Sequence, residues 1–147
     1  MKITIDTREQ KPLKFKAPYV EAITTKKLDF GDYLCTYNDN TDCPFVFERK
    51  SVGDLFGTLG KGHARFRKEI NRATEAGFTL CIIIEKSFNE VWDGYKHSSK
   101  KGIEIIRILN TLLMKYKIPH IYCSNRVEMQ RRISELFYSY GKMKGLK

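Results

Sequence analysis

The continuous apolar run Thr-Leu-Cys-Ile-Ile-Ile-Glu at residues 79–85 restricts the fold more than any other stretch. A strand with one face in water alternates apolar and polar side chains, because successive side chains point to opposite faces. A run without that alternation predicts a strand buried on both faces, which needs a packed layer on each side of the sheet. The run therefore indicates an α/β fold in which a central sheet is flanked by helices.

The rest of the chain alternates between short apolar segments and amphipathic stretches, as such a fold requires. Further strands are predicted at residues 3–6, 22–28, 33–37, 45–50 and 118–123. Helices are predicted to begin at residue 52, to resume at Ala64 and end at a Gly77 cap, and to span residues 103–116 and 126–140. Since no linker, repeat or low-complexity segment interrupts this pattern, we expect one domain over residues 1–147.

Three segments carry weaker patterns. Gly57, Gly60 and Gly62 are expected to interrupt the first helix, because glycine is a poor helix former. Residues 87–101 predict a polar loop in which Trp92 belongs to the core. The basic tail, residues 141–147, is expected to fray.

Composition restricts partners and compartment. Lys and Arg outnumber Asp and Glu by 27 to 17, a net charge of +10 that favours a polyanionic partner. We expect no membrane partner, because no stretch approaches about 18 consecutive apolar residues, and the start lacks a signal region. The scattered cysteines show no zinc-ligand spacing and fit a reducing, intracellular compartment, with Cys81 and Cys123 as buried thiols.

Glu48 and Lys50 stand two residues apart on the predicted strand 45–50, so both side chains share a face with Val46. Asp32, 16 positions upstream, supplies a second carboxylate. Two carboxylates can hold a divalent cation, and a lysine beside them can orient or deprotonate a water. The alternative is a solvated Glu/Lys pair on an edge strand.

Three motifs in order resemble one family. D-x-R-E begins at Asp6, G-D-Y at Gly31, and E-R-K-x-x-x-D runs from Glu48 to Asp54. This order is similar to the nuclease domain of the XPF/Hef family of structure-specific endonucleases, across roughly residues 3–140. The resemblance implies the restriction-endonuclease-like fold with its PD-(D/E)XK signature, in which helices flank a central mixed sheet. Two departures are the Pro-broken stretch 11–20, where relatives have a helix, and the lack of a following helix-hairpin-helix module.

The resemblance implies a Mg²⁺ or Mn²⁺ site. Asp32 and Glu48 would be ligands together with the Arg49 carbonyl oxygen, and Asp6 would lie beside them directly or through a water. Lys50 would position the attacking water. Arg8 and Arg49 would neutralise the phosphate, although Arg8 could instead pair with Glu9, and Arg49 with Asp54.

Residues after the motif are expected to position the helix and to contact DNA. Ser51 is predicted to be an N-cap, with Asp54 completing a capping box. Glycine beside cations suits close approach to phosphates, so DNA contacts are expected from Lys61, Gly62, His63, Arg65, Arg67 and Lys68. The alternative is a surface loop and a solvated helix face. The loop 95–101, with cations beside Trp92 and Tyr95, is a second DNA-binding candidate.

The predicted function is metal-dependent cleavage of branched DNA, such as forks, flaps or junctions. A non-catalytic DNA-binding or scaffold subunit and a restriction-type endonuclease remain as alternatives. A homodimer through residues 103–140 is also expected, because the apolar residues of 103–116 point in too many directions for one helix face. The alternative is that the final helix covers the second face within the same chain.

Overall fold

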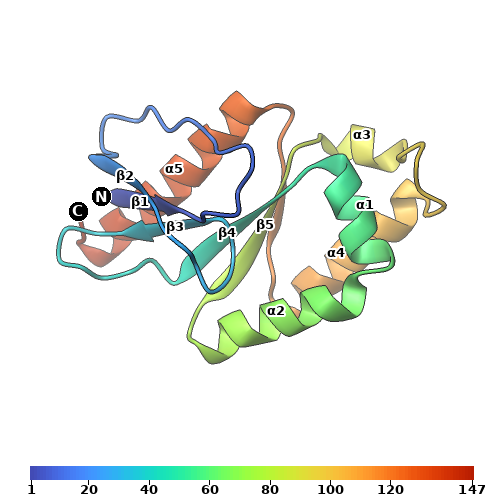
Figure 1. Cartoon of the computed structure of the whole chain (residues 1–147), viewed down its shortest axis with the longest axis horizontal. Coiled ribbons are helices and arrows are strands. Elements are labelled where there is room, and N and C mark those ends of the chain that lie inside the picture. The colour runs from blue at the N-terminus through green and yellow to red at the C-terminus, as the bar shows by residue number, and fades with distance from the viewer.

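The computed structural model describes all residues, 1–147. Its centre is a six-stranded sheet in the order β2-β1-β3-β4-β5-β6 (Figure 1). The strands are β1 (Lys2–Ile5), β2 (Ala22–Thr25), β3 (Tyr33–Thr36), β4 (Phe45–Lys50), β5 (Thr79–Ile84) and β6 (His120–Tyr122). β3 runs antiparallel to β1 and β4, whereas β4, β5 and β6 are parallel to one another. The predicted mixed sheet is confirmed.

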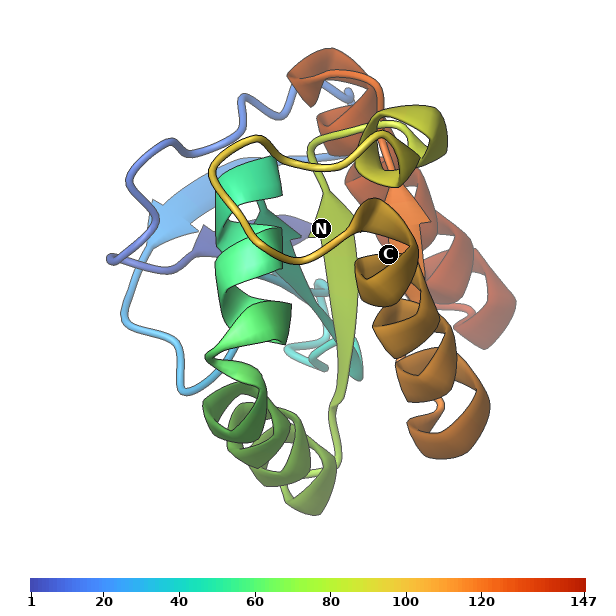
Figure 2. The same ribbon diagram turned by 90° about the vertical axis from the view of Figure 1, so that its right-hand side faces the viewer.

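Helices cover both faces of this sheet. They are α1 (Val52–Gly60), α2 (His63–Glu75), α3 (Phe88–Trp92), α4 (Gly102–Tyr116) and α5 (Arg126–Lys144). Figure 2 shows α1, α2 and α4 in front of β5 and α5 behind it. The apolar run 79–85 forms β5, whose residues from Leu80 to Ile84 are all buried. Strand β5 is buried on both faces, as its unbroken apolar sequence predicted.

Two separate hydrophobic clusters lie on the two faces of the sheet. One packs the strand residues Ile3, Phe47 and Ile83 against Phe137 of α5. The other packs the opposite strand residues, such as Val46 and Ile82, against α1, α2 and α4. Neighbouring residues of β4 and β5 therefore enter different cores, as the alternation along a strand requires.

Three local predictions need correction. The predicted interruption of the first helix is present at Lys61 and Gly62, but Gly57 and Gly60 lie inside α1 and do not interrupt it. The predicted polar loop contains the short helix α3, which begins at a Ser87 capping box, and Trp92 is 53% exposed rather than in the core. The tail does not fray at residue 141, because α5 continues to Lys144.

The predictions for Gly77 and for the buried cysteines agree with the structure. Gly77 follows the last residues of α2 with φ +86°, the left-handed conformation that commonly ends helices. All four cysteines are free and buried. No helix of the chain combines the length and apolarity needed to cross a membrane.

Candidate active site

Backbone hydrogen bonds fix Asp32 beside β4. Its amide donates to the Phe47 carbonyl oxygen at 2.7 Å, and its Oδ2 accepts from the Arg49 amide at 2.7 Å. The preceding Gly31 has φ +75°, and a Cβ there would stand 2.2 Å from Val46 Cγ1. Only glycine suits this turn, because it tolerates positive φ and lacks the clashing atom. The turn formed by the G-D-Y motif therefore places the Asp32 carboxylate beside β4.

Glu48 and Lys50 lie on one face of β4, as predicted. Their Oε1 and Nζ atoms are 3.0 Å apart, and both side chains are almost buried, at 12% and 13% exposure. The Lys50 ammonium also lies 5.2 Å from the centre of the Phe66 ring of α2. An ion pair that is largely shielded from solvent and packed against α2 is not the solvated pair of the alternative interpretation.

Negative charge exceeds positive charge on this face. Burial, together with the neighbouring Glu48 charge, raises the pKa of Asp32 to about 8. Burial also raises the pKa of Glu48, although Lys50 opposes the shift and Glu69 of α2 adds to it. Glu69 lies close to Asp32, since its Oε1 accepts a hydrogen bond from the amide of the preceding Gly31 at 3.5 Å. A cation between these carboxylates would relieve their repulsion.

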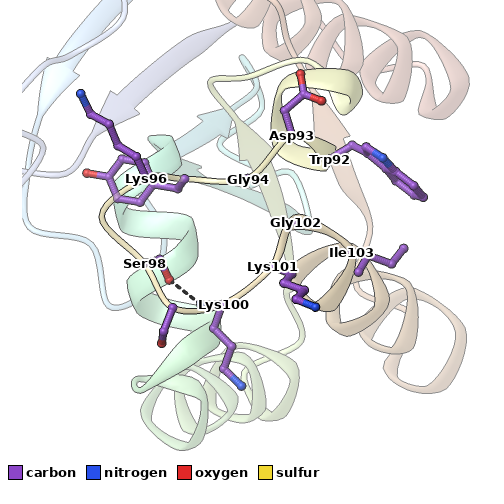
Figure 3. A pocket seen from close by; sticks show the side chains of 11 residues that line it. Trp92, Asp93, Gly94, Lys96, Ser98, Lys100, Lys101, Gly102 and Ile103 are labelled. Carbon is purple, nitrogen blue, oxygen red and sulfur yellow. Dashed lines mark hydrogen bonds between the residues drawn. The ribbon is translucent and has the colours of Figure 1, made fainter.

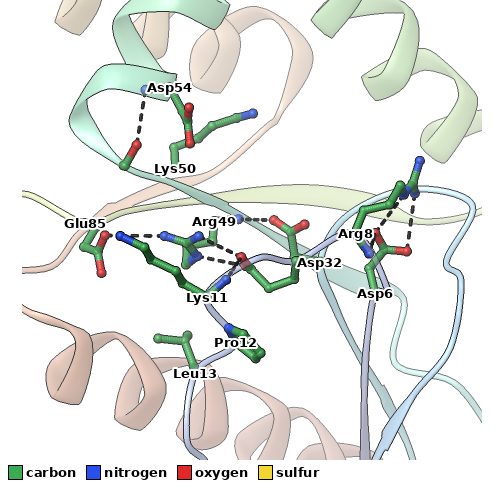
Figure 4. A network of polar contacts seen from close by, with 12 residues as sticks. Asp6, Arg8, Lys11, Pro12, Leu13, Asp32, Arg49, Lys50, Asp54 and Glu85 are labelled. Carbon is green, nitrogen blue, oxygen red and sulfur yellow. Dashed lines mark hydrogen bonds and ion pairs between the residues drawn. The ribbon is translucent and has the colours of Figure 1, made fainter.

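Asp6 and Arg8 form a separate pair at the end of β1 (Figure 4). Arg8 Nε donates to Asp6 Oδ2 at 2.8 Å, and the Leu28 amide donates to Asp6 Oδ1 at 2.8 Å. Burial opposes ionisation of Asp6, but these hydrogen bonds lower its pKa. Arg8 therefore pairs with Asp6 and not with Glu9, which corrects the alternative given above. Its side chain remains 63% exposed.

The Arg49 side chain lies on the opposite face of β4 from Lys50 (Figure 4). It makes two hydrogen bonds to Glu9, at 2.7 and 2.8 Å, and an ion pair with Glu85 at 3.4 Å. Arg126 completes this network from α5, 2.8 Å from Glu85. The alternative prediction that Arg49 pairs with Asp54 was wrong. Asp54 belongs to α1, which packs on the other face of the sheet from the Arg49 side chain. The Arg49 side chain is only 9% exposed, and all three nitrogens of its guanidinium bond to Glu9 or Glu85.

The residues present fit a divalent metal ion through a small set of oxygen donors. No group of three or more His, Cys, Asp and Glu side chains is arranged to hold a metal ion. The carboxylates of Asp32 and Glu48 nevertheless lie near each other, shielded from solvent, and repel each other. Mg²⁺ often takes only one or two carboxylates and retains water, so this pair matches its preference. Direct ligation by Asp6 would compete with the hydrogen bonds from Arg8 and Leu28.

The predicted cap holds α1 at the end of β4. Ser51 Oγ accepts from the Asp54 amide at 3.2 Å, which confirms Ser51 as the N-cap. The reciprocal half of the predicted capping box is absent, since the Asp54 carboxylate makes no hydrogen bond or ion pair. The cap thereby fixes the direction in which the chain leaves Lys50.

The predicted DNA-contacting residues gather at the α1–α2 junction and on α2. Lys61 and Gly62 form the break between the helices, and His63 opens α2. Arg65 and Lys68 are exposed and have no ion-pair partner. Arg67 is also exposed and lies over the Tyr116 ring of α4, 4.7 Å from its centre. This contact gives Arg67 a role in packing α2 against α4.

Sequence reasoning missed Glu69, which adds charge beside Glu48. Glu9, inside the D-x-R-E motif, and Glu85, at the end of β5, hold Arg49 in the structure. The spacing could have found Glu69, because it follows Phe66 by three positions and so lies at the border of the buried face of α2.

Comparison with known families identifies the class of the protein. Residues 5–136 match the ERCC4 domain, so the chain belongs to the ERCC4 domain family, a nuclease family. The resemblance to XPF-type nucleases is confirmed. No curated protein sequence matches the chain.

Solved structures of XPF share the fold. XPF from Aeropyrum pernix is similar at 20% identity and a TM-score of 0.67, covering 92% of this chain and 63% of that one. XPF from Aeropyrum pernix in complex with DNA is similar at 21% identity and a TM-score of 0.71, covering 96% and 65%. The chain thus spans less than two thirds of these structures. The restriction-endonuclease-like fold is confirmed.

Proposed function

We propose that this protein is a divalent-metal-dependent endonuclease that hydrolyses phosphodiester bonds in branched DNA. The observation that carries the proposal is the buried Asp32–Glu48 pair with the Lys50 ammonium 3.0 Å from Glu48. Ion pairs that serve stability alone do not need an unbalanced second carboxylate. Membership of a nuclease family supports the same interpretation, and the preference for branched DNA rests on the resemblance to XPF/Hef enzymes.

Each residue has a defined task in this proposal. Asp32, Glu48 and the Arg49 carbonyl oxygen would hold Mg²⁺ or Mn²⁺, with Asp6 linked through a water. The ion, when bound, supplies positive charge to the phosphate oxygens and acidifies a coordinated water. Lys50 orients the attacking water, whose oxygen bonds to phosphorus as the P–O bond to the leaving sugar oxygen breaks. The exposed Arg8 guanidinium offsets charge on the phosphate.

DNA is the proposed substrate because cations dominate the surface beside the site. The net charge is +10, and exposed Arg65 and Lys68 stand on α2, the helix that contributes Phe66 and Glu69 to the site. Lys61, Gly62 and His63 continue this surface across the helix junction. One of the two similar XPF structures is a complex with DNA, which supports the same class of substrate. Phosphates neutralised by these side chains would supply most of the affinity.

Cleavage of end-labelled fork, flap, four-way-junction and linear duplex DNA with Mg²⁺ or Mn²⁺ tests the proposal. Asp32→Asn and Glu48→Gln should abolish cutting while DNA binding is retained or tightened, since a repelling carboxylate is removed. Asp39→Asn, in the exposed β3–β4 loop, is the matched control and should cut like the wild type.

Other outcomes select the alternatives. Binding without cutting on every substrate would favour a scaffold subunit, and equal or better cutting of linear duplex at one sequence would favour a restriction-type enzyme. Cutting by either carboxylate variant at near wild-type rate would remove Asp32 and Glu48 from the site.

The homodimer through residues 103–140 remains a proposal. Helix α5 packs on the other face of the sheet from α4, so it does not cover the second face of α4. Leu113 and Met114 of α4 are consequently 40% and 73% exposed. Monomers avoid large exposed apolar patches, which supports a partner there.

Light scattering in moderate salt without DNA tests the dimer. A mass near 17.2 kDa would contradict it, whereas twice that mass, halved in Met114→Glu, would support it. Ile105 is unsuitable as a probe, because it is fully buried in the core of its own chain.

A further inference from the structure

A groove with basic walls runs beside α1, outside the carboxylate site. Its volume is about 470 Å³. One wall is α1 and its end at Lys61, and the other is the segment 95–100 between α3 and α4. Its charged and titratable lining consists of Lys61, His97, Lys100 and the Tyr95 hydroxyl, and no carboxylate lines it. Such a surface is complementary to an anion.

The second wall is fixed rather than a loose loop. At its end, a Cβ on Gly102 would stand 2.1 Å from the Val91 carbonyl oxygen and 2.3 Å from that of Trp92. The start of α4 therefore packs directly on the backbone of α3, which brings both ends of the segment together. Within it, the Ser98 amide donates to the Tyr95 carbonyl oxygen at 3.0 Å, and the Lys100 amide donates to Ser98 Oγ at 3.1 Å. Figures 2 and 3 show the segment arching beside α1.

Apart from Phe56, the floor of the groove is helix backbone without side chains. Gly53, Gly57 and Gly60 all line it, and their spacing places them on one face of α1. A Cβ on Gly57 would meet nothing within 4 Å, and one on Gly60 would meet only Lys100 Cγ, at 3.6 Å. The space is therefore open and not filled by packing. Glycines inside a helix destabilise it, and here they leave room for a close approach to the backbone.

The groove begins next to the carboxylate site. The Tyr95 hydroxyl lies 3.3 Å from the Cβ position of Gly53, only three residues after Lys50. From there the groove follows α1 to Lys61, where the exposed cations of α2 begin. A linear polyanion that reaches the site could therefore continue along this path and remain close to the cations of the groove and of α2.

We infer that this groove binds the phosphodiester backbone of a nucleic acid strand and guides it between the α1–α2 junction and the carboxylate site. Lys100 and Lys61 neutralise phosphates from the two walls, His97 and the serines 98 and 99 donate hydrogen bonds, and the glycine floor admits the backbone. The assignment of the polyanion as DNA rests on the proposed function, whereas the groove and its charge do not.

Binding of fluorescein-labelled fork DNA, followed by anisotropy in EDTA, tests the groove without cleavage. Lys100→Glu should weaken binding by about tenfold at low salt and reduce the slope of log affinity against log salt by about 0.9, one phosphate contact. Its control is Lys142→Glu, which makes the same charge change at the far end of α5. The control should retain wild-type affinity to within about twofold.

A second variant tests the open floor without changing charge. Gly57→Leu should weaken binding by about threefold or more while the melting temperature stays equal or rises, since leucine favours helix and a Cβ at this position meets no atom within 4 Å. Ser139→Leu, on the exposed face of α5, is its control.

Each outcome decides the inference. Affinities of Lys100→Glu and Gly57→Leu equal to those of their controls, or a wild type that does not bind DNA, would overturn it. If both variants lose affinity but the wild type cuts nothing, the groove stands and the nuclease proposal falls. If the wild type cuts forks and both variants bind normally, only the groove proposal falls.

Discussion

The two faces of β4 differ in charge balance at the same end of the sheet. On one face, Arg49 and Arg126 oppose Glu9 and Glu85, so two cations meet two carboxylates. On the other face, Lys50 and Arg8, which is already paired with Asp6, oppose Asp32, Glu48 and Glu69. The first face is complete within the chain. The second lacks positive charge, which is the condition for binding a cation from solution.

The Arg49 face should respond most strongly to mutation. Arg49→Ala leaves the carboxylate of Glu9, only 4% exposed, without its partner, and should lower the free energy of unfolding by about 3–5 kcal/mol. Urea denaturation measures the change. Arg126→Ala is the control, because its side chain is 39% exposed and should contribute less than about 1 kcal/mol. Equal losses in both variants would show that burial does not distinguish them.

The Asp32 face should respond in the opposite direction. Asp32→Asn removes a repelling charge but keeps an oxygen to accept from the Arg49 amide. We expect it to raise the free energy of unfolding by about 1–2 kcal/mol at pH 8, where about half of the Asp32 carboxyls are ionised. The same urea experiment measures this. A destabilised variant would mean that the two faces do not differ as described.

Mg²⁺ should stabilise the protein by binding on the Asp32 face and not on the Arg49 face. At a concentration ten times its dissociation constant, the ion should add about 1.4 kcal/mol to the stability of the wild type. Calorimetry with and without Mg²⁺ measures the effect, which Asp32→Asn should remove. Glu85→Gln, on the Arg49 face, should retain it. Loss of the shift in Glu85→Gln alone would move the metal to that face.

The smallest expected effect concerns a histidine outside both charge clusters. Burial lowers the pKa of His120, whose Nδ1 has no hydrogen-bond partner. The unfolded chain therefore gains this proton first as the pH falls through 6.5, and the folded state loses stability below that value. We expect less than about 1 kcal/mol between pH 7 and 5, absent in His120→Gln. An unchanged pH profile in His120→Gln would assign the loss to other groups.

The sequence predicted the fold well where the spacing of side chains along one strand determines the structure. The unbroken apolar run 79–85 located β5, and the spacing of Glu48 and Lys50 placed both side chains on one face. Both follow from the period of a strand, which needs no tertiary information. By contrast, α3 was missed although Ser87 and Glu90 form a capping box, because a helix of five residues has no apolar stripe.

Side-chain partners could not be predicted in the same way. Arg49 had Asp54 as its nearest expected partner in sequence, but it pairs with Glu9 and Glu85, which lie 40 and 36 positions away. Such pairs depend on which face of the sheet each segment reaches. Gly57 also escaped prediction, because the packing of Leu55, Phe56 and Leu59 outweighs the low helix propensity of glycine.

The two hydrophobic clusters also imply an order of assembly. The buried residues of the cluster under α1, α2 and α4 all lie between positions 46 and 118, in the middle of the chain. The cluster under α5 must bring Met1 and Ile3 to Phe137, so it closes a loop of nearly the whole chain. Closing long loops is slower than making local contacts. In pulse-labelled hydrogen exchange during refolding, the amides of β5 and α4 should therefore gain protection before those of β1 and α5.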